Sequence, residues 1–447
     1  MDLLKDYHVL LVLIGTFLLL VVLLPFVRWE IRKLRRAKLL ANQVIPISSL
    51  SEEDIAKIES RHPSGKKMYP SVNRGHCVGC GTCVLSCEKK KTLALISGKS
   101  TLLDPRICDA CGHCEKACPT GANQLIEYGQ KLKVRVPQID ENFETNIPGI
   151  YIIGTLAGAG LIKESINQGR AVLNAIMRDV FPDRLPHIVI VGAGPAGLSA
   201  FLSSRKFGVP ATCLEKDATA NTIRNFPKKK FVMAEPLDMP LVGPIWVGDT
   251  TREKLLEVWD RILEKTEVPI ITGAKLDAVR KEGERFIVSA GGQEIPCDKV
   301  ILALGTRGEP RKLKVPGENL PKVFFQLLDA QEFRGRAITV VGGGDASLEA
   351  SLALVSQGCR VTLIVRGEGF PLAKARNREK IDAAVKQNTV TVRFQSAVRE
   401  IKPKSVVVAS GDRVDEIEND FVFVMIGGEL PFPLLEKIGI RIVEKTL

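Results

Sequence analysis

The sequence predicts an α/β protein with two Rossmann-like dinucleotide-binding domains, a small α+β domain and one N-terminal transmembrane helix. Three observations predict this class. An apolar strand twice runs into a glycine turn and a helix, eight of the eleven cysteines repeat one spacing, and residues 8–27 carry no formal charge. The length of 447 residues allows about three domains.

The N-terminal apolar segment is long enough to span a membrane. At about 1.5 Å per residue, a helix over residues 8–27 would cross a hydrocarbon core of about 30 Å. Basic residues crowd positions 28–38, whereas only Lys5 precedes the segment. By the positive-inside rule, residues 1–40 are a single-pass anchor in the cytoplasmic membrane, with the catalytic domains on the cytoplasmic side. A cleaved signal peptide is the alternative, but no cleavage site follows and the basic flank is on the wrong side.

The charge distribution indicates which partners to expect. The net charge is +12, and a basic strip beside a membrane attracts anionic head groups. Lys89–Lys91 and Lys228–Lys230 could meet an acidic redox partner, although a charge run is usually only a solvated surface. No nucleic-acid-binding motif accompanies these charges. Residues 41–70 are predicted to be a linker, with a short helix that starts near Ser51 and ends before Pro63.

Two runs of four cysteines lie in residues 71–128, each with the spacing C-x2-C-x2-C-x3-C. This is the spacing that binds two [4Fe–4S] clusters, and the fourth cysteine of each run ligates the other cluster. The predicted ligand sets are Cys77, Cys80, Cys83 and Cys118 for one cluster, and Cys108, Cys111, Cys114 and Cys87 for the other. Zinc sites or a disulfide framework are the alternatives, but doubled runs seldom serve zinc. The stretch resembles bacterial dicluster ferredoxins, except that Glu88 stands where that family usually has proline, which could change one cluster's exposure or potential.

The first glycine turn follows the apolar strand at residues 187–191 and leads into a predicted helix that begins at Leu198. Glycines let the backbone approach a pyrophosphate, and the N-terminus of the following helix offers it unpaired N–H groups. Glu215 ends the next strand, where an acid would hold ribose hydroxyls, and Lys216 follows it. The residues predicted to bind the nucleotide at the turn are Gly192, Ala193, Gly194, Pro195, Ala196 and Gly197.

A second turn of the same type follows the strand at residues 337–341 and leads into a helix at residues 348–355. Its predicted binding residues are Gly342, Gly343, Gly344, Asp345, Ala346 and Ser347. Arg366, not an acid, follows the second strand of this unit at residues 360–365. A guanidinium suits a 2′-phosphate, so NADPH is favoured, while Glu368 nearby keeps NADH open.

Together these motifs resemble the thioredoxin-reductase-like group of pyridine nucleotide flavoproteins. The first turn is similar to that family's FAD site and the second to its NAD(P)H site. Residues 300–306, with Gly305, look like its crossover strand, and residues 420–428 look like its return strand. The resemblance implies an FAD-binding domain at residues 134–311, an NAD(P)-binding domain at 312–430, and a return to the FAD domain at 431–447.

The last segment of the family lies upstream in this chain. Residues 143–171, with Gly154, Thr155 and Lys163, are similar to that family's final strand and flavin-facing helix. The resemblance implies that residues 134–180 are a circularly permuted C-terminal FAD segment, because joining residue 447 to about residue 134 restores the family order. Thr155 stands where the family has an acid, which leaves its hydrogen bond to the ribityl chain of FAD in doubt. An unrelated strand and helix is the alternative.

Three cysteines lie outside the two runs: Cys213, Cys297 and Cys359. We expect all three to be buried small hydrophobes. The dithiol variants of the family carry a CxxC in the nucleotide domain, whereas these three cysteines are isolated in sequence, so direct dithiol reduction of thioredoxin by that mechanism is not expected. No side-chain acid or base is predicted to be catalytic, and His76 and His113 are expected to be residues of the cluster loops.

The predicted function is that of a membrane-anchored oxidoreductase that moves electrons between NAD(P)H, FAD and two [4Fe–4S] clusters. A hydride would pass from NAD(P)H to the flavin, and single electrons would leave through the clusters to a ferredoxin-like or membrane redox partner, or travel in reverse. The alternatives are a flavin-dependent reductase of a disulfide or other small molecule, and a redox sensor or wiring subunit without turnover. A homodimer is left open.

Overall fold

The computed structural model describes residues 44–45, 68–73, 76–89, 92–96, 98–103, 108–127, 133–178, 180, 184–232, 237–245, 250–306, 308–371 and 373–446. The predicted transmembrane helix, its basic flank and the short linker helix near Ser51 lie outside these residues. No helix within the described ranges is long and apolar enough to cross a membrane. The chain divides into two compact units, an N-terminal unit of residues 1–130 and a C-terminal unit of residues 131–447.

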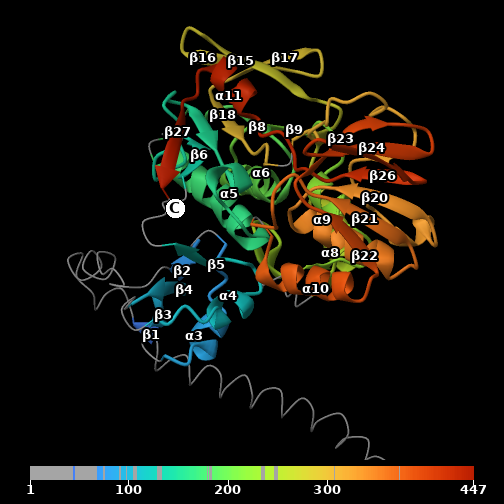
Figure 1. The fold of residues 1–447 in the computed structure, drawn as a ribbon. Coiled ribbons are helices and arrows are strands. Elements are labelled where there is room, and N and C mark those ends of the chain that lie inside the picture. Colours follow the sequence, from blue (N-terminus) through green and yellow to red (C-terminus); the bar gives the residue numbers. More distant parts are fainter. Residues whose placement is uncertain are drawn as a thin grey trace, which may run out of the picture. The chain divides into compact units, whose positions relative to one another are not determined.

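The N-terminal unit combines short helices with short strands (Figure 1). Its antiparallel pairs are β2 (Met68–Val72) with β5 (Asn123–Glu127), and β3 (Leu93–Ile96) with β4 (Lys99–Leu102). β1 (Val44–Ile45) adds to β3 in parallel. β1 and the start of β2 therefore fall in the stretch predicted to be a linker, since a two-residue strand leaves no periodic pattern to read.

The two helices described in this unit begin in the same way. α3 (Thr82–Ser86) follows Gly81 and α4 (His113–Lys116) follows Gly112, and both glycines adopt left-handed backbone conformations with φ of 70° and 80°. Side chains with a Cβ rarely adopt that conformation. The repeated cysteine spacing thus corresponds to a repeated turn, and Cys83 and Cys114 from the two helices share one small core with Leu93 and Leu95.

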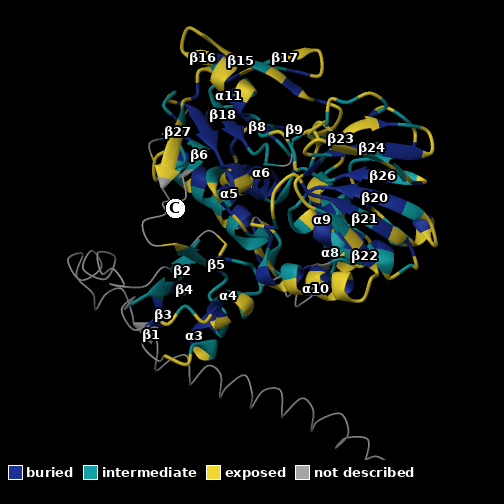
Figure 2. Ribbon diagram, in the orientation of Figure 1, coloured by how far each residue is buried: buried dark blue, intermediate teal, exposed yellow. Residues whose placement is uncertain are grey.

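The C-terminal unit contains two parallel five-stranded sheets. The first has the order β14 (Ile270–Ile271), β9 (Ala211–Leu214), β8 (Ile188–Val191), β18 (Lys299–Leu302) and β7 (Ile150–Ile152). β7 comes first in the chain but lies at the edge of the sheet, paired with β18 through Ile150 and Val300. The central strands are buried on both faces, as their unbroken apolar sequences require (Figure 2).

Two helices lie side by side next to this sheet, α5 (Ile162–Met177) and α6 (Pro195–Phe207) (Figure 1). A Cβ added at Gly169 of α5 would lie 2.3 Å from the carbonyl oxygen of Ala196, so only glycine allows this approach. The Ser199 hydroxyl donates to the carbonyl oxygen of Ile166 at 2.7 Å. α6 begins at Pro195, earlier than the predicted Leu198, because proline at the first helical position loses no hydrogen bond.

Smaller elements complete this domain. α8 (Arg252–Thr266) buries Trp259 against the hairpin of β11 (Leu237–Met239) and β12 (Gly243–Ile245). A meander of β15 (Leu276–Glu282), β16 (Arg285–Ala290) and β17 (Gln293–Cys297) packs against α11 (Phe432–Ile438). The remaining short elements are η3 (Gly154–Ala157), α7 (Asn221–Arg224), β10 (Phe231–Val232) and β13 (Thr250–Thr251).

The start and the end of the C-terminal unit meet in one ladder. β6 (Lys133–Pro137) pairs antiparallel with β27 (Ile442–Thr446), and the two strands lie together in Figure 1. Arg135 and Glu436 add an ion pair of 3.0 Å beside this ladder. The two ends of the unit are therefore neighbours in space although they are far apart in the chain.

The second parallel sheet has the order β19 (Val323–Phe324), β26 (Phe421–Val424), β20 (Ala337–Val341), β21 (Arg360–Ile364) and β22 (Val390–Arg393). The sheet packs against α9 (Asp345–Val355), which starts three residues before the predicted position. The same domain also contains the 3-10 helix η4 (Ala330–Phe333), α10 (Ala375–Lys386) and a meander of β23 (Ser396–Ile401), β24 (Ser405–Ser410) and β25 (Arg413–Glu418). The predicted return strand at 420–428 is β26 with the turn that follows it.

Two chain segments connect the sheets, and they run antiparallel. Pro310 forms an isolated bridge with Gly428, and the Arg311 N–H donates to the carbonyl oxygen of Gly427 at 3.0 Å. The Glu429 N–H donates to the carbonyl oxygen of Glu309 at 2.9 Å. The two dinucleotide domains are thus joined by a narrow double strand.

Candidate cofactor sites

The first glycine turn lies where β8 ends and α6 begins. Gly192 has a φ of 106°, and a Cβ on Gly197 would lie 1.8 Å from the carbonyl oxygen of Gly192, so both positions require glycine. The helix starts after Gly194 without a side-chain cap. Its first N–H groups therefore have no cap side chain as a partner, as at phosphate-binding turns.

Glu215 lies against this turn. Its side chain is buried, one carboxylate oxygen accepts the Ala193 N–H at 2.7 Å, and the other accepts the Asp217 N–H at 3.0 Å. Lys216 is exposed and pairs with Asp217 at 3.5 Å. The structure thus brings Glu215 to the glycine turn and leaves Lys216 on the surface.

A third segment reaches the same edge of the sheet from β7. Gly154 is buried with a φ of 82°, and a Cβ added there would lie 3.1 Å from the Cβ of Ala196. Its N–H donates to the Gln168 side chain at 2.7 Å. Gln168 was not predicted, because only the packing of α5 next to η3 brings it to Gly154.

Thr155 and Gly305 are also neighbours. The Thr155 hydroxyl oxygen accepts the Thr306 N–H at 3.0 Å and lies 3.3 Å from the Thr306 hydroxyl. A Cβ on Gly305, whose φ is 69°, would lie 3.6 Å from the Thr155 hydroxyl. The predicted residues at the ends of β7, β8 and β18 therefore converge, and Lys163 lies in the first turn of α5, which follows η3.

The second glycine turn repeats this geometry between β20 and α9. A Cβ on Gly342, whose φ is 141°, would lie 2.3 Å from the carbonyl oxygen of Met425. α9 starts after Gly344 without a side-chain cap, and the buried Ser347 donates to the Gly344 carbonyl at 2.7 Å. Gly343 is half-buried in the turn and Ala346 is exposed at the start of the helix.

Asp345 and Arg366 have different surroundings at this site. One Asp345 carboxylate oxygen accepts the Lys374 N–H at 2.9 Å and the Asn377 amide at 2.7 Å, so this side chain holds the start of α10. Arg366 is exposed just beyond the end of β21. Glu368 is also exposed and accepts a hydrogen bond from Gln395 at 3.0 Å.

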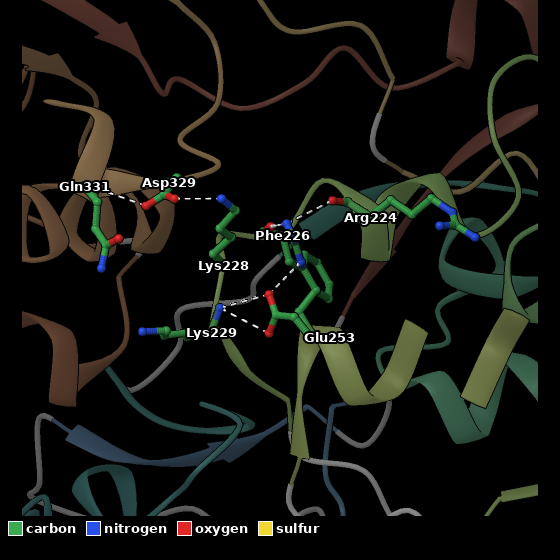
Figure 3. A network of polar contacts seen from close by, with 8 residues as sticks. Arg224, Phe226, Lys228, Lys229, Glu253, Asp329 and Gln331 are labelled. Carbon is green, nitrogen blue, oxygen red and sulfur yellow. Dashed lines mark hydrogen bonds and ion pairs between the residues drawn. The ribbon is translucent and has the colours of Figure 1, made fainter. Parts of the chain in front are cut away.

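The loop that follows α7 in the first dinucleotide domain forms ion pairs with the second dinucleotide domain (Figure 3). Lys228 pairs with Asp329 at 2.7 Å, and its N–H donates to the Leu328 carbonyl at 2.7 Å. Lys230 pairs with Glu349 of α9 at 2.9 Å. We call Lys228, Lys230, Asp329 and Glu349 the interdomain clamp.

Charge pairing shifts the titration of the clamp carboxyls. Burial alone would raise the pKa of Glu349, but the charge and hydrogen bond of Lys230, with the Asn377 amide, lower it. The hydrogen bond and charge of Lys228 lower the pKa of Asp329. Both carboxyls are therefore ionised at neutral pH.

Two cavities among the described residues of the N-terminal unit are each lined by four cysteines. Cavity II is lined by Cys87, Cys108, Cys111 and Cys114. Cavity I is lined by Cys77, Cys80, Cys83 and Cys118. Each set takes three cysteines from one run and the fourth from the other. Across the described part of the chain, no group of three or more His, Cys, Asp or Glu side chains could hold a metal ion directly.

The remaining cysteines lie apart from these cavities. Cys213, Cys297 and Cys359 are all buried, which confirms the prediction that they serve as small hydrophobes. Burial raises the pKa of both Cys213 and Cys297 to about 12. A thiol that stays protonated is a poor nucleophile.

Residues 189–447 match the family model of the pyridine nucleotide-disulphide oxidoreductases. The chain belongs to this family. A bacilliredoxin reductase of Bacillus subtilis is 30% identical over 58% of this chain and 82% of its own length. A ferredoxin–NADP reductase of Ignicoccus hospitalis is 25% identical over 58% of this chain and 83% of its own.

A solved structure agrees with these relatives. The bacillithiol disulfide reductase of Bacillus cereus is 28% identical, with a TM-score of 0.52 over 58% of this chain and 82% of its own. The protein is therefore an NAD(P)H-dependent FAD oxidoreductase. The family match begins at the first residues of β8, so the N-terminal unit, β6, β7 and α5 lie outside it.

The residues at both turns fit the nucleotides of this family. At the first, the uncapped start of α6 suits the pyrophosphate of FAD, and the buried Glu215 suits its ribose. At the second, the uncapped start of α9 suits the pyrophosphate of NAD(P)H. Both turns also depend on glycine, because a Cβ at Gly197 would meet the main-chain oxygen of Gly192 and a Cβ at Gly342 would meet that of Met425.

Proposed function

We propose that this protein is a membrane-anchored oxidoreductase that passes electrons between NAD(P)H, FAD and two [4Fe–4S] clusters, to or from a ferredoxin-like or membrane redox partner. The observation that carries the proposal is the pair of cavities in the N-terminal unit, each lined by a complete set of four cysteines. This unit belongs to the same chain as an FAD and NAD(P)H fold.

The sharing of cysteines between the two runs favours clusters over other uses. In dicluster ferredoxins the fourth cysteine of each run ligates the other cluster, and Cys87 and Cys118 line the cavities in that crossed pattern. When bound, the clusters would exchange single electrons.

On the flavin side, the protein's own residues would bind and orient FAD, and a bound flavin would accept hydride from NAD(P)H and release electrons. Glu215 would hold the ribose, and the start of α6 would hold the pyrophosphate. The start of α5, whose helix dipole is positive there, favours the anionic side of a reduced flavin. The Thr155 hydroxyl oxygen accepts from Thr306, so its own proton remains for donation to the ribityl chain.

NADPH is the favoured nucleotide. Arg366 follows the end of β21, where the second strand of a dinucleotide fold meets the ribose, and a guanidinium suits a 2′-phosphate. Glu368, the acid that would suit NADH, is engaged by Gln395. Steady-state kinetics with both nucleotides tests this preference.

We infer further that residues 134–180 supply the last FAD segment by circular permutation. Three contacts support this: β7 extends the sheet beside β18, Gly169 of α5 packs against α6, and β6 pairs with β27. The family match begins only at residue 189 and leaves part of each relative's length uncovered.

The permutation has a consequence for electron transfer. Residues 128–132 alone separate the end of β5 from the start of β6, and an extended chain covers at most about 20 Å over that length. A tether this short favours transfer within one molecule between clusters and flavin. Membrane attachment through residues 8–27 is tested by separating membranes from soluble protein, with a chain lacking residues 1–40 as the control.

A flavin-dependent disulfide reductase is the second candidate, because two of the similar proteins are a bacilliredoxin reductase and a bacillithiol disulfide reductase. In this reading the disulfide would meet the flavin directly. The buried positions of Cys213, Cys297 and Cys359 weigh against a dithiol relay.

Anaerobic stopped-flow spectroscopy of the full chain separates the two candidates. NADPH is expected to bleach the flavin, and the iron–sulfur absorbance is expected to follow at a comparable rate. A Cys80→Ser/Cys111→Ser variant is the control, since its flavin should bleach while the second signal is lost. Clusters that stay oxidised in the unmodified protein, together with turnover of a low-mass disulfide, would establish the second candidate instead.

A further inference from the structure

The two cysteine cavities differ in their polar surroundings. Cavity I is also lined by Ser100, Thr82, Thr120 and Asn123. Cavity II is lined instead by Pro70, Leu93, Ala110 and Leu125, with Lys89, Thr92, Asp109 and Gly112. Both cavities also have aliphatic side chains in their walls, among them Val72, Val78 and Ala122 in cavity I. The difference therefore lies in the polar groups, which are three hydroxyls and one amide in cavity I, and one hydroxyl and two charged side chains in cavity II.

Asn123 is the decisive residue in cavity I. It is the first residue of β5 and only 1% exposed, yet neither its Oδ1 nor its Nδ2 has a hydrogen-bond partner in the described part of the chain. A buried amide without partners is energetically unfavourable, because it has lost its hydrogen bonds to water and gained none in return. An acceptor inside the cavity, such as a sulfur of a bound cluster, would satisfy its N–H groups.

Ser100 provides further donors to the same cavity. Its hydroxyl oxygen lies 3.2 Å from the Cys83 sulfur, and its main-chain N–H donates to the Cys77 sulfur at 3.3 Å. Once Cys83 is a thiolate ligand, the hydroxyl holds the only proton of that pair and becomes the donor. The Lys99 ammonium adds a positive charge 2.6 Å from the Cys77 carbonyl oxygen.

Cavity II lacks this arrangement among its described residues. The Thr92 hydroxyl donates to the Lys89 carbonyl oxygen at 2.8 Å and is therefore committed elsewhere. A main-chain N–H, that of Ala110, donates to the Cys108 sulfur at 3.4 Å. Lys89 and Asp109 bring charges of opposite sign, which largely offset each other.

We propose that Asn123 and Ser100 raise the reduction potential of the cluster in cavity I above that of the cluster in cavity II, so that electrons entering the N-terminal unit settle on cavity I. The inference rests on the proposed function, because it requires both clusters. Reduction adds one negative charge, which hydrogen-bond donors and a nearby cation stabilise strongly inside a protein of low dielectric.

An anaerobic redox titration of the cluster-loaded full chain, followed by electron paramagnetic resonance, tests this inference. The unmodified protein should show two one-electron steps at separate potentials. Asn123→Leu removes the amide donors, and the ratio of reduced to oxidised cluster in the more positive step should fall about tenfold at fixed potential, which corresponds to about 59 mV. The more negative step should not move.

Thr92→Val is the matched control, since it removes a hydroxyl from the wall of cavity II that already has a backbone partner. Both steps should stay in place in this variant. Ser100→Ala is a smaller change in cavity I and should lower the same step as Asn123→Leu, so it decides the question where the larger substitution prevents assembly. The inference would be overturned if neither Asn123→Leu nor Ser100→Ala moved the more positive step. A shift of the more negative step in either variant would also overturn it.

Iron analysis separates this failure from failure of the proposed function. Two clusters require about eight iron atoms per chain. A chain that binds no iron after reconstitution overturns both proposals. A chain with full iron content and unshifted potentials in the variants overturns only the assignment of Asn123 and Ser100.

Discussion

Replacing Gly169 with alanine should push α5 away from α6 and loosen the FAD site. The added Cβ would lie 2.3 Å from the Ala196 carbonyl oxygen and 2.8 Å from the Ala200 nitrogen, whereas ordinary contacts begin at 3.4 Å. These are main-chain atoms, so no side-chain rotation relieves the contact and the helices must separate by about 1 Å.

The energetic balance sets the size of the effect. Alanine gains about 1 kcal/mol over glycine in a helix interior, while overpacking of this kind costs about 1 to 3 kcal/mol. The backbone position of the clash selects the upper end of that range, so the net loss is about 2 kcal/mol. For a domain of this size we expect the unfolding midpoint to fall by about 4 °C.

Thermal unfolding of the flavin-loaded protein, with flavin retained after gel filtration as a second readout, measures this effect. Gly369→Ala is the control, because a Cβ there meets nothing within 4 Å and its φ is one that any residue adopts. If Gly169→Ala keeps both the midpoint and the flavin, α5 does not pack on α6 as described, and the argument for a permuted FAD segment loses its main contact.

Three other changes give distinct outcomes. Cys87→Ser should abolish the cluster of cavity II although Cys87 belongs to the first run, and iron analysis should show a loss of half the iron; loss of the other cluster's signal would contradict the crossed pattern. Arg366→Ser should raise the KM for NADPH at least about tenfold and leave that for NADH nearly unchanged, since one charge-assisted contact to the 2′-phosphate is lost; an equal rise for both nucleotides would remove the basis of the preference. Glu349→Gln should lower stability by at most about 1 kcal/mol; because the folded pKa of Glu349 is depressed, the difference from the unmodified protein should persist above about pH 4.3 and vanish in stronger acid, and a difference that grows on acidification would contradict the Lys230 pairing.

The local motifs could be predicted because each depends on residues close together in the chain. The strands before both glycine turns, the helices after them and the isolated character of Cys213, Cys297 and Cys359 follow from apolar runs and short spacings. Where prediction and structure differ, the difference is local too. Both helices after the turns begin three residues earlier than predicted, since the turn residues themselves form the first helical turn.

The tertiary structure decided the contacts between residues that lie far apart in the chain. Gln168 reaches Gly154 only because α5 folds back next to η3, and Lys230 meets Glu349 only because two domains approach each other. Lys230 stood out only as part of a basic run and Gln168 only as part of a longer segment, so no spacing in the sequence could identify the residues that they contact.

The sequence by itself therefore determined the two nucleotide turns and the two cysteine runs, because short-range geometry dictates both. The environment of each cysteine set needed the fold. Asn123 and Ser100 lie in two different strands, β5 and β4, and only strand pairing and burial bring an amide without partners and a hydroxyl to the same cavity. Such differences in surroundings arise from packing, which a pattern of spacings does not encode.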